Sequence, residues 1–433
     1  MPRRLETTDT GFDAAFAALL DDKRETAADV DDAVQSIIAD VRARGDAALI
    51  GFTRRFDRLE LTPETLRFSE TEIAEAESRC DPATLEALDV AAARIEAFHR
   101  RQVPADDRFT DADGVELGAR WTPVGAVGLY VPGGTAAYPS SVLMNALPAK
   151  VAGVPRVAMV VPTPDGVINP LVIAAAKRSG VTEIYRLGGA QAVAALAYGT
   201  ETVAPVDKIV GPGNAYVAAA KRRVFGQVGI DMIAGPSEIL VVADAANDPA
   251  WIAADLLSQS EHDTSAQAIL ITDDRDFAGQ VEAAVEAHLA TLSRTEMARE
   301  SWDSHGAVIV TDSLDAAPAL VDRIAPEHLE LAVADPDALM ARIRNAGAIF
   351  LGRHTPEAIG DYVAGPNHVL PTARSARFSS GLNVLDFMKR TTFVRCDAAS
   401  LARIGPAAAT LADAEGLTAH ALSVRIRSNS PGG

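Results

Sequence analysis

Two adjacent residues, Glu327 and His328, are the side chains in this sequence best suited to move protons near neutral pH. They follow Pro326, at the junction between an expected helix and an apolar run. An imidazole with a pKa near roughly 6.5 can accept or release a proton at neutral pH. Because neighbouring side chains point in different directions, we expect the two groups to serve two separate proton transfers. A surface Glu-His pair at a turn begun by proline is the simpler alternative, and the pattern alone leaves it open.

A second pair, Gln259 and His262, lies three residues apart at the end of an expected helix. That spacing places an amide oxygen and an imidazole nitrogen on one helix face, where both can reach one divalent cation. Asp361 and His420 would complete a set of nitrogen and oxygen ligands suited to zinc or a similar divalent ion. A capped helix end with a polar face is the alternative for the pair, and spacing does not show that the four residues converge.

Three glycine-containing turns each follow an expected strand and open an expected helix: Gly133-Gly134, Gly188-Gly189 and Gly211-Pro212-Gly213. Glycine lets the backbone N–H groups of a helix start approach an anionic group such as a pyrophosphate. A doubly wound sheet binds ligands beyond the carboxyl ends of its strands, which is where these turns would lie. The usual G-x-G-x-x-G fingerprint is absent, so tight strand-to-helix connections are an equally good interpretation.

The segments that carry these residues alternate between short apolar runs and amphipathic stretches, which predicts βα units and mostly parallel sheets. The expected strands form two series, 126–131, 157–161, 183–187 and 208–210, then 239–243, 268–272, 307–311 and 348–351. A helical region from about 14 to 98 precedes them, and helices at 400–414 and 417–426 follow. We therefore expect an α/β protein of two doubly wound, Rossmann-like units with a helical N-terminal lead-in and a helical C-terminal tail.

Composition argues against several functional classes. The 433 residues include 40 Lys+Arg and 59 Asp+Glu, a net charge of -19 that repels phosphate backbones and anionic lipid. We expect no nucleic-acid partner and no membrane partner. The longest uncharged segment, 121–149, contains four prolines and is not expected to span a membrane. Only two cysteines, Cys80 and Cys396, occur, which indicates a reducing cytoplasm.

Most other histidines suggest no chemistry. His99 and His288 lie in charged helical stretches, and we expect both to be solvated. His368 follows Gly365-Pro366-Asn367, so we expect it to shape a loop.

Six segments resemble the histidinol dehydrogenase family, in order and over nearly the whole chain. They are IDMIAGPSE at 230–238, QSEHD at 259–263, PEHLE at 326–330, GDY at 360–362, NHVLPT at 367–372 and EGLTAH at 415–420. The resemblance implies a four-electron oxidation of L-histidinol through L-histidinaldehyde to L-histidine, with two NAD+ reduced, as the last steps of histidine biosynthesis. It also implies one Zn2+ per subunit.

Carried over residue by residue, the resemblance assigns a role to each candidate. It implies zinc ligation by Gln259, His262, Asp361 and His420, and NAD contacts from Tyr130, Gln191 and Asn214. It implies substrate contacts from Ser237, Glu415 and His328 as well as from the four metal ligands. It makes His328 the base of the first oxidation, and Glu327 the group that activates water for the second.

The resemblance also implies an organisation and an assembly. We expect a helical arm at 1–24, an α/β domain of 25–129 and 237–380 with the metal and catalytic residues, an inserted NAD-binding domain at 130–236, and a tail at 381–433. In a homodimer this tail would complete the partner's active site. The alternatives are a zinc hydrolase in which Glu327 activates metal-bound water, a dehydrogenase of another small polar alcohol, and a non-catalytic NAD- or metal-binding module.

Overall fold

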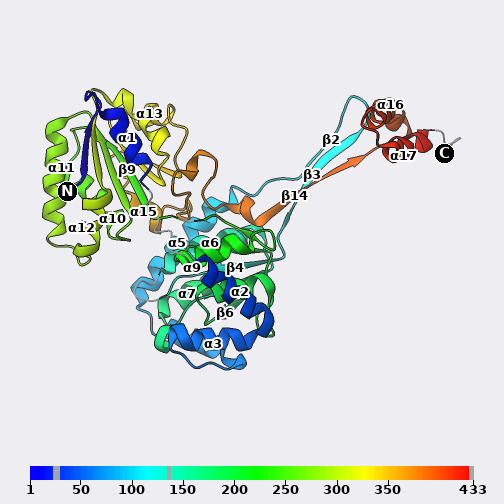
Figure 1. The fold of residues 1–433 in the computed structure, drawn as a ribbon, viewed down its shortest axis with the longest axis horizontal. Coiled ribbons are helices and arrows are strands. Elements are labelled where there is room, and N and C mark those ends of the chain that lie inside the picture. Colours follow the sequence, from blue (N-terminus) through cyan, green and yellow to red (C-terminus); the bar gives the residue numbers. More distant parts are fainter. Residues whose placement is uncertain (23–29, 134–137, 234, 429–433) are drawn as a thin grey trace.

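The computed structural model describes residues 1–22, 30–133, 138–233 and 235–428. Two lobes, each built on a parallel sheet, are joined to a long arm that ends in a pair of helices (Figure 1). The expected α/β class with helical segments towards both ends is therefore confirmed. Gly134 and the expected boundary between residues 24 and 25 lie outside the described residues.

The first lobe contains a sheet in the order β1-β11-β10-β9-β12-β13, and every pairing in it is parallel. Its strands are β1 (Arg3–Glu6), β9 (Glu238–Ala243), β10 (Gln267–Thr272), β11 (Ala307–Val310), β12 (His328–Ala332) and β13 (Ala348–Leu351). Its helices are α1 (Phe12–Leu20), α10 (Pro249–Ser260), α11 (Arg275–Leu289), α12 (Thr295–His305), α13 (Ala317–Ile324), α14 (Pro336–Met340) and α15 (Glu357–Tyr362). One core lies between the sheet and α10 to α12, and the other between the sheet and α1 and α13.

The second lobe contains a sheet in the order β6-β5-β4-β7-β8, also parallel throughout. Its strands are β4 (Ala126–Tyr130), β5 (Arg156–Val160), β6 (Glu183–Tyr185), β7 (Lys208–Val210) and β8 (Gly229–Ile230). The helices that follow its strands are α6 (Pro139–Ala152), α7 (Pro170–Ser179), α8 (Gly189–Tyr198) and α9 (Ala215–Val224).

The N-terminal helices cover this second sheet. They are α2 (Asp31–Arg44), α3 (Asp46–Asp57), α4 (Glu70–Ser78) and α5 (Pro82–Arg100). Val34 of α2 shares a core with α8 and α9, and Ile95 of α5 shares one with α6. This packing differs from the expected grouping of 25–129 with 237–380. An amphipathic pattern shows that a helix needs an apolar surface, but it does not show which sheet offers that surface.

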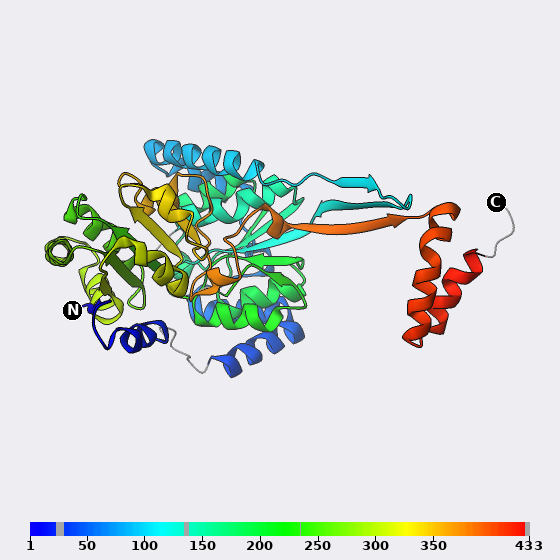
Figure 2. The ribbon, with the colours of Figure 1, turned by 90° about the horizontal axis from the view of Figure 1, so that it is seen from above.

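The arm is an antiparallel sheet of β2 (Asp107–Thr110), β3 (Glu116–Pro123) and β14 (Met388–Arg395). It carries the hairpin of α16 (Ala398–Ala414) and α17 (Thr418–Ser428) well away from both lobes (Figures 1 and 2). Short 3-10 turns complete the described structure at Pro63–Thr65, Pro164–Gly166 (η2), Leu314–Ala316, Ser375–Arg377 and Val384–Phe387.

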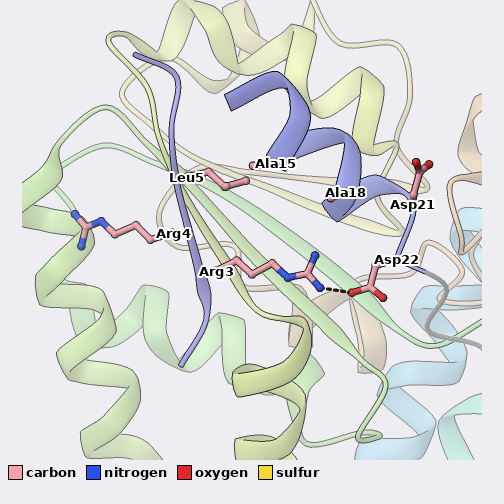
Figure 3. A pocket seen from close by; sticks show the side chains of 7 residues that line it. All are labelled: Arg3, Arg4, Leu5, Ala15, Ala18, Asp21 and Asp22. Atoms are coloured by element: carbon pink, nitrogen blue, oxygen red, sulfur yellow. Dashed lines mark hydrogen bonds and ion pairs between the residues drawn. The ribbon is translucent and has the colours of Figure 1, made fainter. Parts of the chain in front are cut away.

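A surface hollow of about 690 Å³ lies between β1 and α1 (Figure 3). Arg3 donates a hydrogen bond of 2.7 Å to Asp22 across it. Its lining includes none of the residues predicted to form the functional site. Within the described ranges, no helix is both long enough and apolar enough to cross a membrane.

Two histidines differ from expectation. His99 is fully buried, and its Nδ1 lies 2.8 Å from the carbonyl oxygen of Ile95. His288 is half-buried, with Nε2 2.9 Å from the carbonyl oxygen of Ala250. Charged neighbours in the sequence do not reveal that one face of a helix packs inward.

Candidate active site

His328 begins β12 and is buried between β9 and β13. Its Nδ1 lies 2.9 Å from the carbonyl oxygen of Glu238, the first residue of β9. A carbonyl oxygen only accepts hydrogen bonds, so Nδ1 carries the proton and Nε2 holds a free lone pair. Within the described residues, Nε2 has no hydrogen-bond partner. The parallel pairing of two strands therefore selects the tautomer in which Nε2 can act as a base.

Two carboxylates face that nitrogen. Glu357 Oε1 lies 3.6 Å and Asp361 Oδ1 3.9 Å from His328 Nε2. Both carboxylates come from α15, one helical turn apart, and α15 packs against β12 and α10. One ligand atom from each of the three residues lies within 4.8 Å of the other two, which is compatible with a shared metal ion. Glu357 was not singled out from the sequence, although its spacing of four residues from Asp361 places both on one face.

Burial controls how these groups hold protons. It lowers the pKa of His328, so the imidazole is neutral at pH 7 and able to accept a proton. It raises the pKa of Asp361 well above its ordinary range, and the nearby Glu357 charge adds to the effect. Burial, and to a smaller extent the charge of Glu238, likewise raises the pKa of Glu327 well above its ordinary value. A cation bound among these carboxylates would offset the cost of their burial.

Glu327 and Glu238 hold each other in place. The backbone N–H of Glu238 donates to Glu327 Oε2 at 2.9 Å, and the N–H of Glu327 donates to Glu238 Oε2 at 3.3 Å. Ala373 donates from its backbone to Glu238 Oε1 at 3.1 Å. Ser237, another predicted site residue, directly precedes β9 at the same edge. In this lobe the cluster thus lies at the amino ends of the strands, opposite to the edge at which doubly wound sheets usually bind ligands.

Gln259 lies in the last turn of α10, a helix that packs against α15, and His262 follows the end of that helix. Gln259 is 1% exposed, and its Nε2 has no hydrogen-bond partner within the described ranges. Burial lowers the pKa of His262, while the charge of Glu357 opposes that shift. The charge of His262 also lowers the pKa of His328. These mutual effects show that the structure brings His262 near His328 and Glu357.

His368 connects the cluster to the second lobe. Its Nδ1 lies 3.0 Å from the carbonyl oxygen of Asp361, and its Nε2 lies 3.3 Å from Ser141 Oγ on α6. Burial lowers the pKa of His368 to about 4, so the ring is neutral. The side-chain amide of Asn367 donates to the carbonyl oxygen of Met144, also on α6, at 2.6 Å. The expected loop-shaping histidine therefore helps to hold Asp361 between the two lobes.

The predicted NAD contacts lie at the carboxyl edge of the second sheet. Tyr130 ends β4, and its hydroxyl accepts the backbone N–H of Gly189 at 3.0 Å. Gln191 is buried in the first turn of α8. Asn214 caps α9 by accepting from the backbone N–H groups of Tyr216 and Val217 at 3.1 and 3.2 Å. The structure thus places the three residues at the starts of helices or beside them, where a phosphate group can bind.

Glycine at these turns permits close approach of the backbones. A Cβ on Gly133 would lie 2.4 Å from the carbonyl oxygen of Pro162, and one on Gly188 would lie 2.5 Å from Pro162 Cβ. A Cβ on Gly211 would lie 2.1 Å from the carbonyl oxygen of Tyr130. The loops after four neighbouring strands therefore converge at one edge, which only glycine allows.

Glu415 and His420 are not brought to the cluster within this chain. Glu415 follows α16, His420 lies on α17, and both are exposed. Figures 1 and 2 show their hairpin at the far end of the arm. These two predicted site residues are thus separated from the cluster, in which His262, Glu327 and Asp361 lie around His328.

Comparisons with known proteins identify the family of the chain. The family model described as histidinol dehydrogenase matches residues 20–428. The chain is 71% identical over 430 residues to a histidinol dehydrogenase of Rhodospirillum rubrum, covering 99% of both chains. It is 66% identical over 427 residues to one of Cereibacter sphaeroides, covering 99% of this chain and 98% of that one. A crystal structure of histidinol dehydrogenase from Elizabethkingia anophelis matches with a TM-score of 0.94 and 36% identity, covering 98% of each chain. The chain therefore belongs to the histidinol dehydrogenase family of oxidoreductases.

Proposed function

We propose that this protein oxidises L-histidinol through L-histidinaldehyde to L-histidine and reduces two NAD+ in the process. The observation that carries the proposal is the free Nε2 of His328, a buried neutral imidazole that faces two carboxylates. Hydride leaves a carbon only as the hydroxyl proton is removed, so the first oxidation needs a base of this kind. Family membership supports the substrate and the place at the end of histidine biosynthesis.

Zn2+ is the proposed metal, one per subunit, with Gln259, His262, Asp361 and His420 as ligands. The donors suit it, because neutral imidazole and carboxylate oxygen are ligands that zinc prefers. The buried Asp361 also fits a bound cation, because burial raises its pKa and a neighbouring cation would stabilise its charged form. When bound, the ion would orient the imidazole and amine of the substrate. Ser237 and Glu415 are the further proposed substrate contacts.

His328 and Glu327 are each proposed to carry out one of the two proton transfers. His328 Nε2 takes the hydroxyl proton during the first oxidation, and the Glu238 carbonyl holds the ring in position through Nδ1. Glu327 exchanges a proton with the water that adds to the aldehyde, and burial holds the pKa of this carboxyl well above its ordinary value. Glu357 adds negative charge opposite His328, which favours a cationic amine in the site.

NAD+ is the proposed oxidant, with Tyr130, Gln191 and Asn214 as contacts. The glycine turns and helix starts around these residues suit a pyrophosphate. The expected assignment of 130–236 as the NAD-binding region remains part of this proposal.

A homodimer with shared active sites is the proposed assembly. Leu411 and Leu422 on the terminal hairpin are 64% and 58% exposed, although both are large apolar side chains. Neither lobe of the same chain lies near enough to cover the hairpin (Figure 2). A second copy that seated the hairpin would bury these side chains and bring Glu415 and His420 to its own cluster. The cytoplasm is the proposed compartment, and Cys80 and Cys396 are both free thiols.

The purified protein tests these proposals together. Its zinc content is measured by inductively coupled plasma mass spectrometry, and NADH formation is followed with L-histidinol as the only reductant. We expect stoichiometric zinc and histidinol-dependent NADH. Asp40, a half-buried carboxylate on α2 that pairs with Arg44, provides a matched control as Asp40→Asn. A zinc hydrolase, the principal alternative, would hold the metal and form no NADH.

A further inference from the structure

Among the buried polar atoms of the second lobe that have no hydrogen-bond partner in the described part of the chain, three belong to two segments that contact each other. They are Asp57 Oδ2, Thr53 Oγ1 and Thr163 Oγ1. Their residues are 7%, 0% and 2% exposed, respectively. Buried polar groups in native proteins are nearly always satisfied, so such atoms indicate a partner that the chain itself does not supply. None of the three belongs to the site residues described above.

Thr53 and Asp57 lie in the second half of α3 and Thr163 in the loop after β5, and α3 packs against η2 in that loop. Arg58, which follows α3, donates from Nε to Asp165 Oδ1 in η2 at 2.6 Å. The side chain of Leu59 lies 3.5 Å from the position that a Cβ on Gly166 would occupy. These contacts hold the last turn of α3 against the segment that begins with Thr163. Thr53 and Asp57 are four residues apart and therefore share one face of α3.

This location adjoins the proposed NAD contacts. Thr163 directly follows Pro162, the residue against which Gly133 and Gly188 pack. Burial, with a smaller contribution from the charge of Asp57, raises the pKa of Tyr130 to about 12. The Tyr130 hydroxyl accepts the N–H of Gly189 at the start of α8. Asp57 therefore lies near the turn at which a pyrophosphate would bind.

We propose that the carboxylate of Asp57 accepts hydrogen bonds from the hydroxyl groups of the adenosine ribose of NAD+, with the Thr53 hydroxyl beside it, and thereby selects NAD+ over NADP+. This inference rests on the proposed function. A carboxylate has enough lone pairs to accept from two neighbouring hydroxyl groups. The 2′-phosphate of NADP+ would instead meet a buried negative charge, which dinucleotide-binding folds use to exclude it.

The arrangement of the lobes indicates which ribose is involved. The nicotinamide must reach the carbon that loses hydride, and His328 lies in the first lobe. Figure 1 shows α3 on the side of the second lobe that points away from the first. With the pyrophosphate at the start of α8, the half of the cofactor that extends towards α3 is the adenosine half.

Equilibrium titrations of the full-length protein with NAD+ and NADP+, followed by calorimetry, test the inference. We expect Asp57→Asn to raise the Kd for NAD+ about tenfold, the size of effect caused by losing a hydrogen bond to a charged group. The Kd for NADP+ should not rise. The ratio of the Kd for NADP+ to the Kd for NAD+ should therefore fall. Thr53→Val should weaken NAD+ binding less. Asp40→Asn removes a half-buried charge paired with Arg44 and should leave both dissociation constants unchanged.

The cofactor analogue 2′-deoxy-NAD+ gives a second measurement that does not depend on the stability of a variant. The wild-type protein should bind it more weakly than NAD+, whereas Asp57→Asn should bind the two nearly alike. Without cofactor, Asp57→Asn should melt no earlier than wild type, because a buried carboxylate without a partner is removed. A purely structural role for Asp57 predicts earlier melting and an unchanged cofactor preference.

Two results would overturn the inference in different ways. If wild type binds NAD+ and Asp57→Asn keeps both its affinity and its preference over NADP+, Asp57 does not contact the ribose, while the proposed function stands. If wild type binds no NAD+ in any titration, the proposed function itself fails and the inference fails with it.

Discussion

The Nδ1 atom of His328 lies 2.9 Å from the backbone carbonyl oxygen of Glu238, while its Nε2 faces Glu357 and has no hydrogen-bond partner among the described residues. Because β9 and β12 are neighbours in one sheet, the backbone of one strand determines which ring nitrogen of a side chain on the other is free. The same two strand starts lock the Glu327 side chain through the N–H of Glu238. A single strand pairing thus positions both the proposed base and the proposed second proton carrier.

Replacing His328 should abolish the first oxidation without abolishing binding. In His328→Ala the hydroxyl proton has no acceptor, so kcat for histidinol should fall by about 10²–10⁴-fold. Binding of histidinol and zinc should persist. His328 is not among the proposed zinc ligands, and it is only one of several proposed contacts to histidinol. Stopped-flow NADH formation combined with calorimetric titration of histidinol measures both quantities. Loss of histidinol binding in a folded His328→Ala protein would contradict the assignment.

Glu327→Gln should mainly impair the second oxidation, from histidinaldehyde to histidine. The amide keeps the shape of the side chain but cannot exchange a proton with water, so oxidation of supplied histidinaldehyde should slow more than oxidation of histidinol. Single-turnover NADH formation from each substrate separates the two steps. Equal slowing of both steps in Glu327→Gln and His328→Ala would show that the two residues do not divide the transfers.

Removing a proposed ligand should lower the metal content. His262→Asn and Asp361→Asn each replace a preferred zinc donor with an amide, so bound zinc and activity should fall together. His354→Asn provides a matched control, since His354 is exposed and lies outside the cluster. Metal analysis after dialysis measures the occupancy. Full occupancy in His262→Asn would remove His262 from the ligand set.

Stability should depend on pH through a buried histidine away from the site. Burial lowers the pKa of His99 below its unfolded value of about 6.5. The unfolded chain therefore binds the extra proton, and stability is lost as the pH falls through and below about 6.5. In His99→Leu that part of the pH dependence should disappear. Urea midpoints of both proteins on either side of that pH measure it, and identical pH slopes would contradict the prediction.

Mixed dimers test whether the tail serves the partner. A His328→Ala chain and a His420→Asn chain should each be inactive alone. If the tails exchange, the His420→Asn body receives an intact His420 from the partner, so one of the two sites in a heterodimer is wholly wild type. About half of the site activity should then return on refolding the mixture. If verified heterodimers stay inactive, each tail serves its own chain.

The sequence predicts the periodic part of the fold well, because buried parallel strands are short apolar runs. All eight expected strands form, each within two residues of its expected bounds. Of the strands that were not expected, β12 is fully buried, but its run is interrupted by His328 and Glu330, and others lack the apolar pattern altogether. Most of β14 is exposed and polar, and β1 is a charged edge strand. Such strands are stabilised by pairing with a distant segment, as β14 pairs with β3, and local composition does not show that pairing.

Local sequence also fails to show which distant residues meet at the candidate active site. The residues Glu327 and His328 could be selected from their types, and the ligand set from family resemblance. Glu357 and Glu238 could not be assigned roles, because their importance depends on lying opposite His328 in three dimensions. Asp57 lies in an ordinary charged helix end, and its burial is visible only once α3 is packed against the loop after β5.

The yield of NADH per molecule of L-histidinol tests the central claim most directly. Limiting L-histidinol is converted to completion by the zinc-loaded protein in excess NAD+, and NADH and L-histidine are quantified together. The account predicts close to two NADH and one L-histidine for each histidinol consumed. A yield near one with accumulating aldehyde, or consumption of histidinol without NADH, would contradict it.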